Sequence, residues 1–186
     1  CPAIVDALCG LPRYADDEVV TSAVTALASQ LRLGSGPAGH ILADLFAHGG
    51  AWAQAVQSEI LYPLNPDSVL RSFARFLREK LESITPDSTD QGEQRMIALV
   101  GSLPDHDSVG WLTKRVQHGR DQNPDNRGPL AATVVYLVEH IAALGAAKSG
   151  EAKAVLVGSL ERPRGWHGYY YREVAKEAMV ALGNLG

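Results

Sequence analysis

The sequence predicts an all-α protein. Apolar residues recur every three or four positions along nearly the whole chain, as they do in helices that turn one face to a core. No stretch of any length alternates apolar and polar residues as a half-buried strand would. Proline and glycine fall between the apolar stripes, where they end helices and form turns. We therefore expect nine or ten helices of roughly 10–19 residues joined by short turns.

The clearest helix is expected over residues 66–84. There Val69, Phe73, Phe76 and Leu77 lie on one face, and arginine and glutamate occupy the others, as in a partly exposed amphipathic helix. The remaining stripes, in chain order, fall at 20–31, 41–45, 52–60, 97–103, 109–116, 130–144, 152–160 and 174–185. Gly145 is one of the residues expected to mark a break between helices.

Composition and charge narrow the class of protein. The chain has 186 residues, 20% of them charged, and a net charge of −4, which fits a single soluble all-α domain over 1–186. No apolar run reaches the ~20 residues that a membrane-spanning helix needs. The mild acidity argues against broad binding to a nucleic-acid backbone, because such binding needs a strongly basic surface.

Three of the expected helices end in related sequences. These are IALVGSLP at 97–104, IAALGAAK at 141–148 and MVALGNLG at 179–186. Aligning them places Gly101, Gly145 and Gly183 in register, about 40 residues apart, which is the length of two helices and their turns. The chain therefore contains an internal helix-pair repeat.

The segment REVAKEAMVALGNLG at 172–186 resembles the first helix of a HEAT-type repeat. More specifically, it resembles the bacterial HEAT-like repeats described in phycobiliprotein lyases, with their Arg-x-x-Ala-x-x-Ala-Leu-Gly-x-Leu-Gly signature. The resemblance is clearest over 90–186, whereas 1–85 carries degenerate helices. It implies a HEAT-like α-solenoid of stacked antiparallel helix pairs, in which Ala178, Ala181 and Gly183 let helices approach closely; an irregular helical bundle is the alternative.

Both ends of the sequence suggest a segment of a longer protein. The chain begins with Cys1 rather than Met, and the helix that ends in ALGNLG has no partner helix after it before Gly186. A mature lipoprotein acylated at Cys1 is a second interpretation, but neither a cleavage site nor a polar linker accompanies that cysteine. A cytoplasmic location is preferred, although two cysteines, Cys1 and Cys9, do not decide the redox compartment.

The most unusual stretch is RPRGWHGYYYR at 162–172. It crowds aromatic and cationic side chains together, namely Trp166, Tyr169, Tyr170 and Tyr171 with Arg162, Arg164, His167 and Arg172. Proline and two glycines predict a surface loop, and Trp, Tyr and Arg dominate the strongest contacts of protein interfaces. We therefore expect a partner-binding site here. In the alternative, the rings fold back to fill a groove between repeats, and Tyr170 or Tyr171 begins the next helix.

Other polar groups are weaker candidates. Arg71, Arg75 and Arg78 form a basic stripe that, together with Lys114 and Arg115, could suit an acidic partner or nucleic acid. A solvated helix face, partly balanced by glutamates, is the preferred interpretation.

The histidines and carboxylates are expected to be structural. His40, Asp44 and His48 line one helix face, but a span of about 12 Å is too long for one metal ion. His106, His118 and His140 are expected to be surface or satisfied structural residues. Asp105 and Asp107 are better explained as helix caps than as an acid–base pair.

These observations favour a non-catalytic scaffold that binds another protein. No phosphate-binding loop, dinucleotide fingerprint, metalloprotease helix or nucleophile elbow is present, and neither a cofactor nor a metal is expected. Two alternatives remain open because of the resemblance. One is a nucleic-acid-binding HEAT-like protein of the DNA glycosylase type, and the other is a tetrapyrrole lyase or chaperone.

Overall fold

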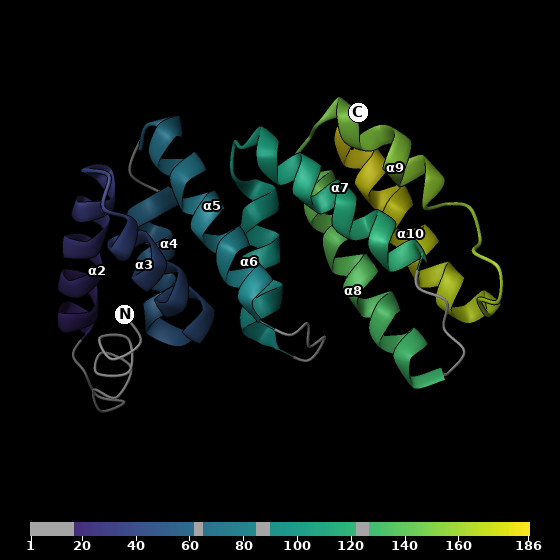
Figure 1. Cartoon of the computed structure of the whole chain (residues 1–186), viewed down its shortest axis with the longest axis horizontal. Coiled ribbons are helices and arrows are strands. Elements are labelled where there is room, and N and C mark those ends of the chain that lie inside the picture. Colours follow the sequence, from purple (N-terminus) through teal and green to yellow (C-terminus); the bar gives the residue numbers. More distant parts are fainter. Residues whose placement is uncertain (1–16, 62–64, 85–89, 122–126) are drawn as a thin grey trace. The chain divides into compact units, whose positions relative to one another are not determined.

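The computed structural model describes residues 17–61, 65–84, 90–121 and 127–186 (Figure 1). Within these ranges the chain forms nine α-helices and one short 3-10 helix, with no strand, which confirms the all-α prediction. The chain divides into two compact units. None of the helices in these ranges is long and apolar enough to cross a bilayer. The predictions about Cys1 and Cys9 fall outside the described residues.

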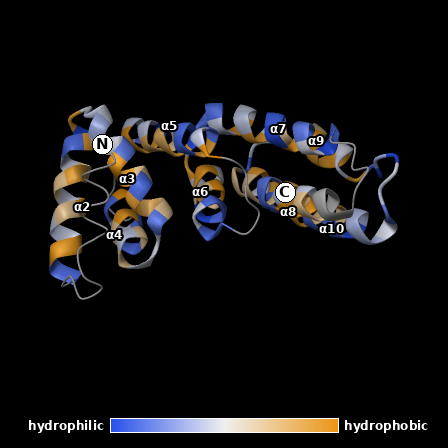
Figure 2. Ribbon diagram, turned by 60° about the horizontal axis from the view of Figure 1, so that its bottom comes forward, coloured by the Kyte–Doolittle hydropathy of each residue, from blue (hydrophilic) through white to orange (hydrophobic). Residues whose placement is uncertain are grey.

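The first unit is built around one central helix. Its elements are α2 (Asp17–Arg32), α3 (Gly36–His48), α4 (Gly50–Leu61), α5 (Asp67–Ser83) and the first half of α6 (Gln91–Ser102), through Met96. Helix α3 packs against α2, α4 and α5. It buries residues on most of its circumference, as a helix inside a core does. Helix α5 is instead buried on one face only, so orange and blue alternate along it in Figure 2.

Side chains make the contacts between α3 and α5. A Cβ atom added at Gly39 of α3 would lie 2.8 Å from the Cζ atom of Phe76, so the glycine leaves room for that ring. Beside it, Lys80 Nζ lies 2.6 Å from a carboxylate oxygen of Asp44. The helix expected over 66–84 is thus found at α5, with its apolar face on α3.

The second unit is also centred on one helix. It holds the rest of α6, from Ile97, followed by α7 (His106–Asp121), α8 (Arg127–Ala146), a 3-10 turn (Gly150–Ala152), α9 (Lys153–Gly158) and α10 (Gly168–Leu185). Helix α8 packs against both α7 and α10. Its long apolar stripe, including Leu137, Ile141 and Leu144, is fully buried. Asp105 caps α7, because its carboxylate accepts the N–H of Ser108 at 3.1 Å.

Two of the three glycines in register lie where helices almost touch. A Cβ atom at Gly101 would lie 2.7 Å from the Cα of Ala143, and one at Gly145 would lie 2.6 Å from the Cα of Ala181. Gly145 is the second-last residue of α8, so the break between helices comes one residue after it. A side chain at Gly145 would collide with both the methyl group and the Cα of Ala181 in α10.

Candidate partner-binding surface

Segment 162–172 spans the end of a loop and the start of α10. Gly165 has φ 82°, a left-handed conformation that favours glycine. The N–H of Trp166 then donates to the carbonyl of Pro163 at 3.3 Å, and His167 is extended immediately before α10. Because α10 begins at Gly168, the three tyrosines belong to its first turn rather than to the loop.

Part of this segment holds the loop in place. Trp166 is only 2% exposed, and its backbone oxygen accepts hydrogen bonds from both Nε (2.8 Å) and Nη2 of Arg162. The hydroxyl of Tyr171 donates to the carbonyl of Leu160. Trp166, which we expected at a partner contact, therefore belongs to the core. For Trp166, the alternative in which the aromatic rings fold back into the protein describes the segment better.

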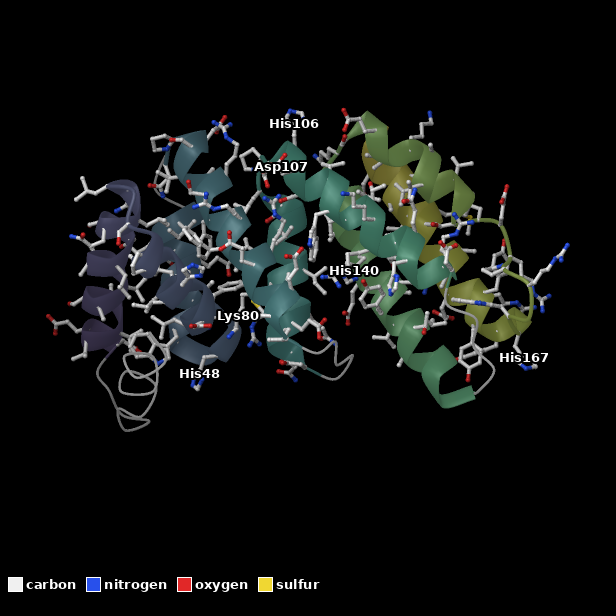
Figure 3. All side chains as sticks on the ribbon, in the orientation of Figure 1. His48, Lys80, His106, Asp107, His140 and His167 are labelled. Atoms are coloured by element: carbon white, nitrogen blue, oxygen red, sulfur yellow. The ribbon has the colours of Figure 1, made fainter. Side chains whose placement is uncertain are left out.

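The rest of the segment faces solvent. Tyr169 is 71% exposed, and its ring meets that of half-buried Tyr170 edge to face, with the centroids 5.6 Å apart. Figure 3 shows His167 pointing away from the ribbon near the start of α10. We call this set the tyrosine surface; it consists of half-buried Tyr170 and of the exposed residues Arg164, His167, Tyr169 and Arg172.

The tyrosine surface carries two arginines, Arg164 and Arg172. The exposed carboxylates Glu161 and Glu173 flank the segment on either side. Among the described residues, none of the ion pairs involves Arg164 or Arg172. These two guanidinium groups are therefore available, beside an exposed aromatic ring, to a carboxylate of another molecule.

The basic stripe is divided between the two units. Arg71, Arg75 and Arg78 lie on α5 in the first unit, while Lys114 and Arg115 lie on α7 in the second. The α5 cations interact locally. Arg71 lies 4.0 Å from a carboxylate oxygen of Asp67, and Arg75 lies 3.6 Å from Glu79. Such i, i+4 pairing is typical of a solvated helix face, as the sequence predicts.

The row of His40, Asp44 and His48 on α3 also interacts with α5. His40 Nε2 lies 3.7 Å from Glu79, and the carboxylate of Asp44 is held by Lys80. His48 is exposed. Nowhere in the described part of the chain do three histidine, cysteine, aspartate or glutamate residues gather as a metal site would require.

Sequence reasoning did not identify a buried aromatic cluster around His140. This histidine of α8 is 1% exposed, and its ring lies 4.2 Å from that of Tyr136 and 5.8 Å from that of Trp111. Its Nδ1 is 2.8 Å from the carbonyl of Tyr136, so Nδ1 carries the proton of the neutral ring. Burial, reinforced by the charge of Arg115, lowers the pKa of His140 to about 4.

His140 is therefore an uncharged core residue at neutral pH. The only signal in the sequence was its position between Leu137 and Ile141 on the apolar face of α8. Its neighbour Trp111 lies on α7 and stacks with the guanidinium of Arg115, 4.9 Å from the ring centre. The cluster thus joins α7 to α8.

Comparison with protein-family models, with curated proteins and with solved structures found no match.

Proposed function

We propose that this chain is a non-catalytic HEAT-like helical-repeat module that binds another protein through the tyrosine surface. The repeat is supported by a close helix–helix contact that recurs at two of the glycines. Gly101 meets Ala143, and Gly145 meets Ala181, so each glycine adjoins the alanine two positions before the next glycine in register. Repeat proteins stack equivalent helices in this way and use the resulting surfaces for binding.

The chemistry of the tyrosine surface supports a protein partner. An exposed tyrosine gives a large contact area with little loss of side-chain freedom, and arginine adds charged hydrogen bonds. Here Tyr169 stands on the first turn of a helix, and the turn before it is fixed by buried Trp166. A contact residue on a rigid base loses little entropy when it binds.

The test compares what the immobilised chain captures from extracts of its own cells. We expect the double variant Tyr169→Ala, Arg164→Ala to lose a protein that the wild-type chain captures, with affinity reduced about 30-fold or more if these are hot spots. Helical circular dichroism should be unchanged, because both side chains are exposed. The control is Lys153→Ala, which removes an exposed charge from α9. Equal capture by all three proteins would contradict the proposal.

A second variant tests whether Trp166 stabilises the fold or contacts the partner. Trp166→Ala removes a buried ring and should lower the free energy of unfolding by about 3–5 kcal/mol. Urea denaturation followed by circular dichroism measures this. A Trp166→Ala protein with unchanged stability that also lost its partner would place the indole at the interface instead.

A further inference from the structure

The polar groups of the tyrosine surface are mostly hydrogen-bond donors. The guanidinium groups of Arg164 and Arg172 can only donate, and the tyrosine hydroxyls can donate as well as accept. Arg172 lies three residues after Tyr169 on α10, so these two side chains are neighbours on one side of the helix. The surface therefore fits a ligand that presents acceptors beside apolar groups.

The charges around the surface favour a ligand whose acceptors are neutral. Glu161 precedes the segment and Glu173 directly follows Arg172, and both carboxylates are exposed. These carboxylates would repel a strongly acidic ligand, because like charges at close range destabilise a complex. A peptide carbonyl accepts the same hydrogen bonds without carrying a charge. The ligand is therefore expected to offer backbone carbonyls rather than a cluster of acidic side chains.

The rings of Tyr169 and Tyr170 supply the apolar part of the surface. Their planes cross at 77°, with the centroids 5.6 Å apart, and Tyr169 is 71% exposed. Because the two rings meet edge to face, they do not cover each other as stacked rings would. The pyrrolidine ring of proline is compact, apolar and rigid, and aromatic side chains are the groups that recognise proline-rich segments in several binding domains.

One backbone conformation offers both free carbonyls and proline rings. Helices and paired strands use most of their carbonyls within their own hydrogen-bond ladders. A polyproline II segment has no internal hydrogen bonds, and its prolines have no N–H that would need an acceptor. It is also extended before it binds, so it loses little conformational freedom.

We propose that the tyrosine surface binds a proline-rich segment of a partner protein in the polyproline II conformation. A proline ring packs against Tyr169, and backbone carbonyls of the segment accept hydrogen bonds from Arg164 and Arg172. This inference rests on the proposed function, because it names the chemistry of the partner at the same surface.

The probe is a fluorescently labelled peptide of ten L-prolines, which adopts the left-handed polyproline II helix in water. Fluorescence anisotropy measures its binding to the whole chain. The control peptide contains ten D-prolines, so it has the same composition and hydrophobicity but the opposite hand. We expect the L-peptide to bind at least about tenfold more tightly than the D-peptide, because only the L-peptide presents its rings and carbonyls in the order that the surface requires.

Three variants of the chain locate the contact. Tyr169→Ala removes the ring and should lower the affinity for the L-peptide about tenfold or more. Tyr169→Phe keeps the ring but loses the hydroxyl, and should lower it by only about threefold. The matched control is Met179→Ala, which removes another exposed apolar side chain about 15 Å further along α10 and should bind as the wild type does. Helical circular dichroism should be the same in all four proteins.

Three results would overturn the inference. They are equal affinity for the L- and D-peptides, unchanged affinity in Tyr169→Ala, and no detectable binding of the L-peptide. Capture of a cellular protein that depends on Tyr169, without any binding of the L-peptide, would overturn this inference and leave the proposed function standing. Absence of both would contradict both, so failure of the ligand chemistry is distinguishable from failure of the surface.

Discussion

The two units bring their helices together by different means. In the first, α3 meets α5 through side chains, with the ring of Phe76 over Gly39 and the ion pair of Lys80 with Asp44. In the second, Gly101 of α6 meets the backbone of Ala143 in α8, and Gly145 meets the methyl group and Cα of Ala181 in α10. Side-chain contacts can be made by many residue types, whereas a backbone contact allows only the smallest. That restriction fits the presence of glycine at both 101 and 145 in the second unit.

The largest expected difference between the units is their response to acid. The pKa of His140 is near 6.5 in an unfolded chain and about 4 in the second unit. Between these values the unfolded chain binds the proton and the folded chain does not. The free energy of unfolding of the second unit therefore has its full value above pH 6.5. It decreases by up to about 3 kcal/mol as the pH falls toward 4.

Hydrogen exchange at pH 7 and pH 5 should show the second unit opening first. Protection of α8 is expected to fall more than protection of α3. The variant His140→Phe keeps an aromatic ring but cannot be protonated, so it should lose most of this pH dependence. An identical pH response in that variant would show that another group controls acid opening.

A smaller difference is expected from adding one methyl group in each unit. Gly145→Ala would place its Cβ against the backbone of Ala181, which moves only with its helix, and should lower stability by about 2–3 kcal/mol. Gly39→Ala meets the buried ring of Phe76, which ends a rotatable side chain, and should lower stability by about 1–2 kcal/mol. Urea denaturation measures both. Gly183→Ala changes a glycine at the same register position that has no neighbour in the way, so its stability should rise by up to about 1 kcal/mol. Equal losses of stability in all three variants would contradict the proposed difference between the two units.

The smallest effect concerns the ion pair of the first unit. Asp44→Asn should lower stability by about 0.5 kcal/mol, since both partners are partly exposed and water competes for them. The loss should shrink in about 1 M salt, where the charges are screened. Thermal melts at low and high salt measure it, with Glu161→Gln, an exposed carboxylate without this contact, as the control. A salt-independent loss would point to packing rather than charge.

Periodicity predicted most helices of this fold because each has one buried face. The stripe over 66–84 became α5, and the stripe over 130–144 became α8. The start of α10 was harder, because Pro163, Gly165 and Gly168 all suggested a loop. A glycine at the first helical position is tolerated there, and the chain turns into the helix at Gly168.

The candidate site was only half predictable for a different reason. The crowding of aromatic residues in 162–172 is visible in the sequence, but which ring enters the core depends on where the loop folds. Trp166 is buried and Tyr169 is exposed, three residues apart. Likewise, the surroundings of His140 come partly from α7, so the sequence near position 140 does not reveal them.

The contact of Gly145 with Ala181 also bears on how the second unit can deform. Only the methyl group of Ala181 lies between the two backbones, so no change of rotamer can absorb a small displacement. If α8 tilts or slides, α10 has to travel with it as a rigid rod. We expect a displacement of α8 at this contact to be passed to α10, whose first turn carries the three tyrosines.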